Sequence, residues 1–384
     1  MTRSIEIKVL DGVDQIAQSA WDTLVGDGSP FLEWAFLSAL ERTGCVGGDT
    51  GWIPQIITAW ESDVLIGAVP FYLKLHSQGE FIFDWGWAEA AERAGIRYYP
   101  KGLVAVPFTP VTGARLLIHP SQADPKALKE VLVEATLTIA KELSLSSVHF
   151  NFTNENDTLP LGEKDLPVRK SVQYHWYNED FRTFDDFLAV FRSKRRANIR
   201  RERRILADRG VTTRVITGSA ITHSDMKRAF RYYSRTVDKF YYGRRYLNDA
   251  FFEELQSTFA DRIHLLVAEQ DGTAYAGAFN LLKGDRLYGR YWGCRREEEF
   301  THFEVCMYAP IEWCIQNQIR VFEPGAGGEH KFERGFRATT MLSAHWIANP
   351  GLRDAIADFV TREAEHVDQQ VEWMDARGPF KRGD

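Results

Sequence analysis

The sequence is poor in the residues and patterns that mark several classes of protein. Its 384 residues include only four cysteines, with no CxxC pair and no histidine at zinc-finger spacing: Cys45, Cys294, Cys306 and Cys314. This scarcity excludes a disulfide scaffold and a zinc finger, and the thiols are expected to be reduced. There is no G-x-S-x-G motif either, which argues against a hydrolase of that type.

Long apolar runs and an excess of positive charge are also missing. No segment approaches the roughly 18 to 20 apolar residues of a membrane span, and MTRSIEIKVLDGVDQ lacks the apolar core of a secretory signal. The 47 Lys and Arg against 53 Asp and Glu give a net charge of −6, which argues against a chain coated for nucleic acid. We expect a cytoplasmic protein with no membrane span, of unknown oligomeric state.

What the sequence does contain is one α/β plan that occurs twice. WIPQIITAWESDVLIGAVPFYLK predicts two strands around a turn at Glu61–Asp63, and RIHLLVAEQDGTAYAGAFNLLKG repeats this plan with the turn EQDGT. Each hairpin precedes an amphipathic helix and a short apolar strand, first ALKEVLVEATLTIAKELS with SVHFNF, then FEVCMYAPIEWCIQNQ with IRVFEP. A duplicated unit explains this, although α/β chains also produce chance parallels.

We therefore predict an α/β protein built from two tandem units, with a C-terminal helix. The expected bounds are 1–155 for the first unit, 156–184 for a connecting segment, 185–350 for the second unit and 351–384 for the C-terminal helical segment. Pro310 should kink the second amphipathic helix or mark a late start, because proline removes a backbone N–H group.

A glycine-rich loop follows the last short strand of the second unit. In EPGAGGEHKFERGF, Gly325, Gly327 and Gly328 would let N–H groups face a ligand oxygen or would permit a positive φ. Ligands of open α/β sheets bind beyond the carboxyl ends of strands. The loop also carries many groups that move protons or hold anions: Glu323, Glu329, His330, Lys331, Glu333 and Arg334. A flexible connector is the alternative interpretation.

Three further stretches add candidate residues. LYGRYWGC places Arg290 among apolar neighbours, where it either holds an anion or lies at a solvated edge. FTHFEV supplies His302 and Glu304, an acid/base pair just before a helix. YYGRRYLN contains Tyr242, which either contacts a substrate or belongs to a helix–helix turn at Gly243.

The run FRSKRRANIRRERRI has eight Arg or Lys and a single Glu. As a helix it could bind the phosphates of a nucleic acid, with an affinity that falls steeply with salt. A solvated helix whose cations pair with acids elsewhere is the alternative. Arg195 lies on one helical stripe with the apolar residues of this region, and this position points it toward protein or ligand. The apolar residues of the stripe are Leu188, Phe191, Ile199 and Leu206.

Four motifs occur in a fixed order: LYGRYWGC, THFEVC, FEPGAGGEHKFERGF and SAHWI. Together they resemble the FemAB-like family of the GNAT acyltransferase superfamily. This family is similar to the Fem peptidyltransferases. The resemblance covers roughly residues 15–380. It implies two GNAT-like domains, each a mixed sheet flanked by helices, with the site in the second. It also implies an N-acyltransferase, because Fem-type enzymes transfer an amino acid from aminoacyl-tRNA to an amine and the wider superfamily uses acyl-CoA.

Two departures from the family patterns leave both donors open, acyl-CoA and aminoacyl-tRNA. The pyrophosphate loop Q/R-x-x-G-x-G/A is matched by Arg290-Tyr-Trp-Gly293-Cys-Arg295 except at its last position. FERGF has the shape of the Fem element F-K-x-G-F with Glu333 at the lysine position, flanked by Lys331 and Arg334. If tRNA is the donor, the basic helix offers Arg195, Arg200, Arg201 and Arg204 to its phosphates.

Amide formation requires a base, since the acceptor amine must lose a proton. The candidates are Glu304, Glu323 and His330, of which Glu304 is preferred because it opens a helix beside the loop. N–H groups of Gly327 and Gly328 would stabilise the carbonyl oxygen, while Arg290 and Lys331 would hold the donor's phosphate or carboxylate.

Further substrate-binding candidates are His302, Gly325, Arg334, Tyr242 and Arg195. The acceptor is expected to be a small-molecule amine, and no metal is expected. A protein of another class fits the same residues: a non-catalytic GNAT-like module that binds an amine-bearing or anionic ligand.

Overall fold

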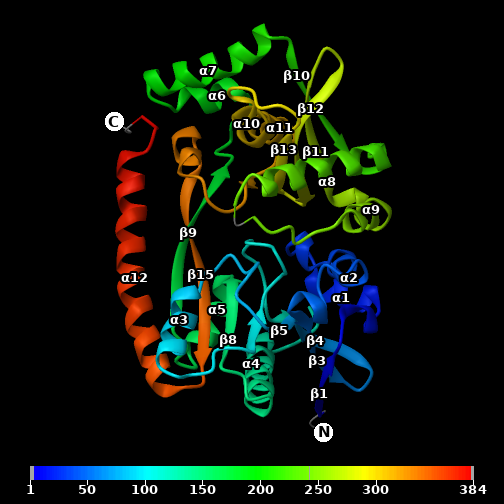
Figure 1. The fold of residues 1–384 in the computed structure, drawn as a ribbon, viewed down its shortest axis with the longest axis vertical. Helices are drawn as coiled ribbons and strands as arrows, with labels where there is room; N and C mark the ends of the chain where they lie inside the picture. The colour runs from blue at the N-terminus through cyan, green and yellow to red at the C-terminus, as the bar shows by residue number, and fades with distance from the viewer. Residues whose placement is uncertain (1–3, 242, 382–384) are drawn as a thin grey trace. The chain divides into compact units, whose positions relative to one another are not determined.

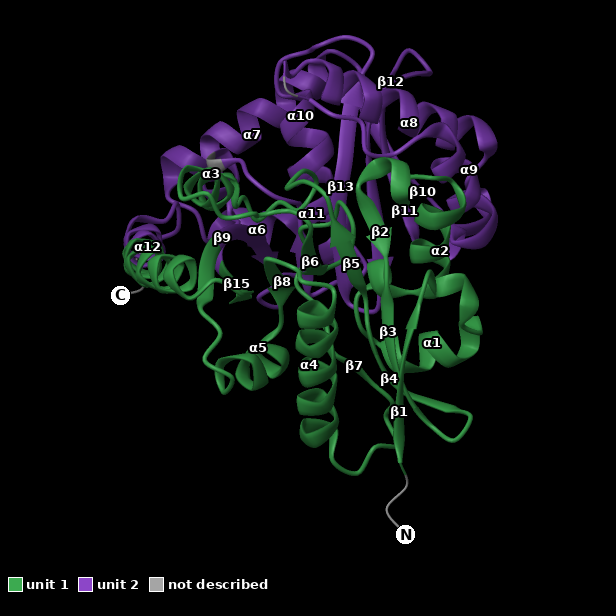
Figure 2. Cartoon of the chain, turned by 60° about the horizontal axis from the view of Figure 1, so that its bottom comes forward, with its two compact units in different colours: residues 1–171, 340–369 green, residues 172–339, 370–384 purple. Residues whose placement is uncertain are grey.

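The computed structural model describes residues 4–241 and 243–381, which form two compact units (Figures 1 and 2). Unit 1 comprises residues 1–171 and 340–369, and unit 2 comprises residues 172–339 and 370–384. The chain passes into unit 2 within strand β9 (Val168–Tyr177), returns within β15 (Arg337–Ile347) and leaves again within helix α12 (Pro350–Arg377).

Unit 1 contains strands of two sheets. The first has the order β1-β3-β4-β7, and the second contributes the neighbouring strands β15-β8-β6-β5-β2. Their bounds are β1 Ile5–Leu10, β2 Trp52–Pro54, β3 Ile56–Glu61, β4 Val64–Val69, β5 Phe71–Lys74, β6 Lys101–Val104, β7 Leu117–Ile118 and β8 Ser147–Thr153.

The first predicted hairpin forms, but each of its two strands is divided. The break between β2 and β3 falls at Gln55, and the break between β4 and β5 falls at Pro70. Because proline has no N–H group to donate to a ladder, it interrupts the strand. The outer pieces β2 and β5 pair with each other in the second sheet, while β3 and β4 pair in the first.

Helix α4 (Pro125–Glu142) covers the main core of unit 1. It begins at Asp124, whose side chain accepts a hydrogen bond from the N–H of Ala127, with Pro125 in the first turn. Its buried Leu128, Leu132 and Val133 pack in one cluster with residues of β3, β4, β6 and β8. The other helices of this unit are α1 Gln18–Val25, α2 Trp34–Arg42, α3 Trp85–Arg93 and α5 Glu155–Gly162, with 3-10 turns at Val13–Gln15, Pro30–Leu32 and Gly48–Thr50.

Unit 2 contains the neighbouring strands β10-β11-β12-β13-β14-β9. The new bounds are β10 Val211–Thr217, β11 Ile263–Gln270, β12 Thr273–Lys283, β13 Arg286–Cys294 and β14 Val321–Glu323. All neighbours are antiparallel except β13 and β14. A parallel pair of this kind requires a crossover, and the helical segment between residues 301 and 316 supplies it.

The helices of unit 2 lie on opposite faces of this sheet. Helix α8 (His223–Asp238) packs Tyr232 against Gly277 and Gly293. The crossover helix packs Val305 and Ala309 with Ala276, Ala278 and Cys294. Neighbouring positions of a strand point to opposite faces, so the two helices cover different sides. The remaining helices are α6 Phe184–Ala189, α7 Ser193–Asp208 and α9 Asp249–Thr258, with 3-10 turns at Gly218–Ala220 and Ala260–Arg262.

The crossover helix is irregular just before Pro310, as the position of this proline predicts. It consists of a short α10 (Thr301–Phe303), a π-helical turn (Glu304–Tyr308) and α11 (Ala309–Gln316). Pro310 stands at the start of α11, where its missing N–H group is tolerated. Both units therefore contain a hairpin, a helix and a short strand in the same chain order, as the repeated plan predicts.

Candidate active site

The glycine loop, residues 324–336, begins where β13 and β14 stop pairing. The two strands pair only from Arg286 with Val321 to Tyr288 with Glu323, although β13 continues to Cys294. Just beyond the paired residues, Arg290 is the extra residue of a bulge in β13 opposite β12. A Cβ atom on Gly289 would lie 3.1 Å from Pro324 Cα, so the start of the loop is in close contact with β13.

The three predicted glycines adopt backbone conformations that other residues rarely take. Gly325, Gly327 and Gly328 have φ values of +88°, +72° and +84°. The loop folds back on the Lys331 ammonium, which donates to the carbonyl oxygens of Gly325 at 2.6 Å and Ala326 at 3.4 Å. Burial lowers the pKa of Lys331 to about 8. A buried ammonium thus lies inside the loop with backbone carbonyls as its partners.

Two histidines, His302 and His330, lie near the loop, and the positive charge of Lys331 acts on both. A Cβ atom on Gly328 would lie 2.9 Å from the His330 imidazole and 3.4 Å from Lys331 Cε, so both side chains lie close to the Gly328 backbone. The rings of His302 and His330 are 5.4 Å apart, and His302 also packs on Trp292 at 4.4 Å. Burial lowers the pKa of His330 and brings that of His302 to about 4, with nearby positive charge acting in the same direction. Both imidazoles are therefore uncharged at neutral pH.

Glu323 forms a second titrating group at the end of β14. Its Oε1 accepts a hydrogen bond from Arg286 at 3.0 Å, and its Oε2 lies 3.8 Å from His175 Nε2 on β9. Burial raises the pKa of Glu323 to about 7, against the opposing charge of Arg286. Burial, together with Arg286 and Lys331, lowers the pKa of His175 to about 3. The Glu323 carboxyl is thus half-ionised near neutrality beside an uncharged imidazole.

Glu304 faces helix α7 and is held by Arg203 in a forked ion pair. The three hydrogen bonds from Arg203 measure 2.9 to 3.2 Å, and the same guanidinium reaches Glu312 at 2.6 Å. Burial raises the pKa of Glu304, while Arg203 acts to lower it. The structure places Glu304 in the first turn of the π-helical segment, with both carboxylate oxygens bonded to Arg203. Among the described residues, Glu304 forms no hydrogen bond or ion pair with His330 or Lys331.

Helix α7 also holds the C-terminal half of the glycine loop. Arg195 pairs with Glu333 at 2.9 Å, and Arg334 pairs with Glu202 at 3.1 Å. The Arg334 guanidinium carbon lies 3.4 Å from the centre of the Phe303 ring, so this buried arginine fixes the loop against both helices. Arg195 and Arg334 thus have protein partners.

The remaining predicted residues lie outside this cluster. Arg290 is half-buried, with its guanidinium carbon 5.2 Å from the centre of the Tyr291 ring. Tyr242 lies outside the described residues. Arg200, Arg201 and Arg204 are exposed on α7, and of these Arg200 pairs with Asp185 at 2.8 Å.

Sequence reasoning missed three side chains that contact the predicted ones. Arg203 and Glu202 belong to the run interpreted as a phosphate-binding face, yet they point inward to Glu304 and Arg334. His175 comes from β9, within the segment that was expected to connect the units. The alternating pattern of VRKSVQYHWY is typical of a strand and could have indicated β9.

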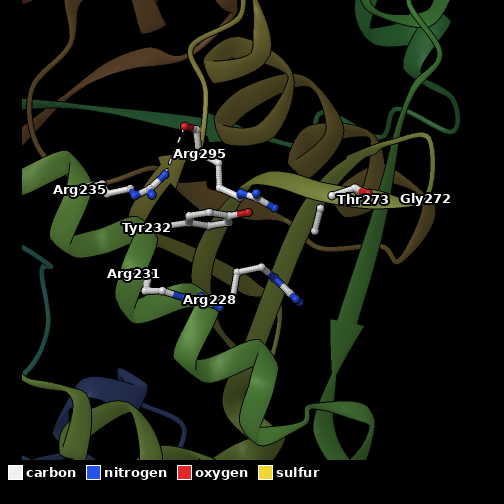
Figure 3. A pocket seen from close by; sticks show the side chains of 8 residues that line it. Arg228, Arg231, Tyr232, Arg235, Gly272, Thr273 and Arg295 are labelled. Atoms are coloured by element: carbon white, nitrogen blue, oxygen red, sulfur yellow. Dashed lines mark hydrogen bonds between the residues drawn. The ribbon is translucent and has the colours of Figure 1, made fainter.

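The cavity of unit 2 and the glycine loop are separate features. A cavity of about 540 Å³ is lined by α8, the β11–β12 turn and Arg295, and by none of the predicted catalytic residues (Figure 3). Within residues 4–241 and 243–381, no group of three or more His, Cys, Asp or Glu side chains is arranged to hold a metal ion. None of the described helices is both long and apolar enough to cross a membrane.

The chain is similar to several solved structures over most of its length, and FemX shares its fold. FemX covers 89% of this chain and 98% of its own, at 12% identity and a TM-score of 0.55. L-PGS from Bacillus licheniformis (90% and 92%, 9% identity, TM-score 0.46) and a tandem GNAT protein from the clavulanic acid biosynthesis pathway (90% and 99%, 9% identity, TM-score 0.44) are more distant in structure. No curated protein matches the sequence.

The topology and the FemX likeness define an α/β protein of two tandem units, each with sheet strands flanked by helices, and a C-terminal helix. The predicted fold class is confirmed. The chain belongs to the FemAB-like family, described as peptidoglycan biosynthesis/recognition, whose match spans residues 12–382.

Proposed function

We propose that unit 2 transfers an acyl or aminoacyl group from an activated donor to an amine, forming an amide. The observation that carries the proposal is that the Lys331 ammonium donates to the carbonyl oxygens of Gly325 and Ala326, in a loop that begins where β13 and β14 stop pairing. In this proposal the base is His330, and the ammonium of Lys331 and the N–H groups of the loop glycines stabilise the oxyanion. Membership of the FemAB-like family supports the same class of reaction.

His330 is the base in this proposal. Its side chain is exposed, so an acceptor amine can reach it, and its lowered pKa keeps the imidazole uncharged and able to accept a proton. The amine nitrogen attacks the donor carbonyl carbon, and one amine proton passes to His330. The tetrahedral intermediate then expels the donor's thiolate or ribose oxygen, which takes that proton from His330, and the amide remains.

Lys331 and the glycine N–H groups stabilise the oxyanion of that intermediate. The ammonium is charged below a pKa of about 8 and turns from the Gly325 carbonyl toward the developing negative charge. In a buried position a positive charge beside the oxyanion is worth more than the same charge in water. Gly327 and Gly328 donate from the adjacent backbone.

Glu323 and Glu304 have other roles in this proposal. Glu323 has a pKa of about 7 but is only 4% exposed, so an amine in solvent has no direct path to it. Glu304 holds Arg203 and thereby positions α7 against the crossover helix. Both carboxylates act on the shape of the site rather than on the substrate.

The donor is acyl-CoA or aminoacyl-tRNA, and the acceptor is a small-molecule amine. The exposed Arg200, Arg201 and Arg204 favour a contact between α7 and tRNA phosphates. Both donors are cytoplasmic molecules, so the proposal places the protein there.

Acyl transfer from a panel of acyl-CoAs and charged tRNAs to diamines and amino acids tests the function. Release of CoA or of deacylated tRNA, dependent on acceptor and on His330, is expected. If no donor is consumed while an amine or anion raises the melting temperature, the protein is a binding module and the transferase proposal fails.

Salt dependence of tRNA binding tests the α7 contact separately. The triple variant Arg200→Gln, Arg201→Gln, Arg204→Gln should flatten the slope of log K against log salt by about 2 to 3, since each released phosphate contact contributes about 0.7 to 0.9. A slope equal to the wild-type value would show that these three arginines do not contact tRNA and only face solvent.

A further inference from the structure

Strand β1 forms one edge of the four-strand sheet in unit 1 (Figure 2). The order of this sheet is β1-β3-β4-β7, so β3 is the only strand among the described residues that pairs with β1. None of the six residues of β1, IEIKVL, is buried. The open edge of a strand presents backbone N–H and C=O groups that a further strand can pair with. Strand β1 is therefore a surface on which a second strand fits.

One hydrogen bond shows which backbone groups of β1 face this open edge. The Thr58 hydroxyl donates to the carbonyl oxygen of Lys8 at 3.1 Å, and Thr58 is the β3 residue directly opposite Lys8. The Lys8 carbonyl therefore points toward β3. In an antiparallel pair, the N–H and C=O groups of one residue point to the same side, and the side alternates from residue to residue. The open edge thus presents the backbone groups of Ile5, Ile7 and Val9.

The side chains of β1 place apolar groups on one face and charges on the other. Ile7 packs against the main core of unit 1. Ile5 and Val9 lie on the same face but are 40% and 41% exposed. Glu6 and Lys8 lie on the opposite face, where they form an exposed ion pair at 3.1 Å. The core of unit 1 therefore reaches the sheet edge with two aliphatic side chains that this chain leaves partly uncovered.

We propose that β1 pairs with β1 of a second copy of this chain, antiparallel and across a two-fold axis at Ile7. The backbone groups that exchange hydrogen bonds in this arrangement are those that face the open edge. On the apolar face, Ile7 lies opposite its own equivalent, and Ile5 lies opposite Val9 of the second copy. On the charged face, Glu6 lies opposite Lys8 of the second copy. The strand is thus complementary to itself on both faces, as a two-fold interface requires.

The charges of β1 specify this register against its neighbours. Sliding one strand by two residues in one direction places Lys8 opposite Lys8, and sliding it in the other direction places Glu6 opposite Glu6. Opposite charges across a strand pair stabilise it, whereas like charges directly opposite each other destabilise it. A slide by one residue sets outward backbone groups against inward ones and exchanges the two faces. A single antiparallel register therefore satisfies the backbone, the apolar face and the charges together.

The pairing is independent of the proposed acyl transfer, because β1 belongs to unit 1 and contains none of the candidate catalytic residues. Sedimentation velocity of the full chain at increasing concentration tests it without an activity assay. The 44.0 kDa chain should be in equilibrium with a dimer. Lys8→Glu sets two acidic groups opposite each other at both symmetry-related positions. It should weaken the dimer by about tenfold or more, and Glu6→Lys should do the same.

The matched control is the double variant Glu6→Lys, Lys8→Glu, which exchanges the two charges and keeps opposite signs across the pair. It should dimerise as strongly as wild type. A mixture of the two single variants should form a mixed dimer, because each strand then faces only opposite charges. Melting temperatures equal to that of wild type show that the single variants are folded.

A proline variant tests the backbone pairing without any change of charge. Val9→Pro removes an N–H group from the open edge of each copy and leaves the pairing with β3 in place, so it should also weaken the dimer. A wild-type chain that stays monomeric at the highest concentration reached overturns the proposal. A dimer that Lys8→Glu and Val9→Pro leave unchanged overturns it as well, since its interface then lies elsewhere. A double variant as weak as the single ones would show that the charges do not pair across the axis, which also contradicts this register.

Discussion

The Lys331 ammonium donates a hydrogen bond of 2.6 Å to the carbonyl oxygen of Gly325, six residues earlier in the same loop. This contact closes the glycine loop around a cation whose pKa is lowered to about 8 by burial. The loop therefore folds back on the side chain of its own lysine. It holds a charge next to His330 and to the glycines, and the predictions below start from that geometry.

Gly327→Val should remove transfer activity while the fold survives. The backbone of Gly327 has a φ of +72°, which a β-branched residue avoids, although a Cβ atom there meets nothing within 4 Å. The cost is therefore backbone strain of about 1 to 2 kcal/mol, which shifts the loop. The measurement is transfer rate together with melting temperature.

Gly284→Val is its matched control. Gly284 also has a positive φ, of +56°, and open space around its Cβ position, but it lies in the β12–β13 turn. It should lose similar stability and keep its activity. Equal activity in the two variants would show that the glycine loop is only a connector.

The pH profile of kcat/KM should have two limbs. The acid limb lies below pH 6.5, because His330 must be uncharged and its pKa is lowered from the ordinary histidine value of 6.5. The alkaline limb lies near 8, where the Lys331 ammonium loses its proton. Lys331→Arg should move the alkaline limb upward, since a guanidinium stays charged. An alkaline limb that stays near 8 in Lys331→Arg would contradict the assignment of that limb to Lys331.

Glu323→Gln should become more stable relative to wild type as the pH rises. The pKa of Glu323 is raised from 4.5 to about 7 by folding, so its contribution to stability is full below pH 4.5 and is lost as the pH rises through 7. The difference in unfolding free energy between variant and wild type should grow by roughly 3 kcal/mol over that window. Urea unfolding at pH 4.5 and pH 8 measures it. A difference that is the same at both pH values would show that the carboxyl titrates normally.

Glu304→Gln should cost stability rather than turnover. It removes the charge that Arg203 holds with three hydrogen bonds, and hydrogen bonds to charged groups are worth about 1.5 to 3 kcal/mol. Turnover should stay within a few-fold of wild type at a temperature where the variant is folded. A fall of about 10²-fold or more with unchanged stability would instead make Glu304 the base.

The sequence predicts more of the fold than of the contacts within the site. The repeated hairpin plan, the irregular helix at Pro310 and the positive φ of the loop glycines all follow from local chemistry, because proline and glycine act on their own backbone. The partners of Glu304 and Arg334 do not follow from local chemistry, because they come from distant parts of the sequence. Arg203 is 101 residues from Glu304, and Glu202 is 132 residues from Arg334.

The basic run illustrates why charge composition is ambiguous. Of its arginines, Arg195, Arg200 and Arg203 reach carboxylates in the protein, while Arg201 and Arg204 are exposed and have no carboxylate partner among the described residues. Composition gives the number of cations, but only the helix orientation decides which of them are already neutralised. The cavity of unit 2 that α8 lines could not be predicted for the same reason. It joins α8 to residues after β13 and in the β11–β12 turn, which are distant in the sequence.

Single-turnover transfer by Lys331→Met tests the central claim most directly. With the donor identified by the panel, the variant should transfer its acyl group about 10² to 10³ times more slowly than wild type, the loss typical of one oxyanion donor. Lys227→Met, an exposed lysine of the same unit, should react at the wild-type rate. A Lys331→Met protein that is folded and transfers as fast as wild type would contradict the assignment of the glycine loop as the active site.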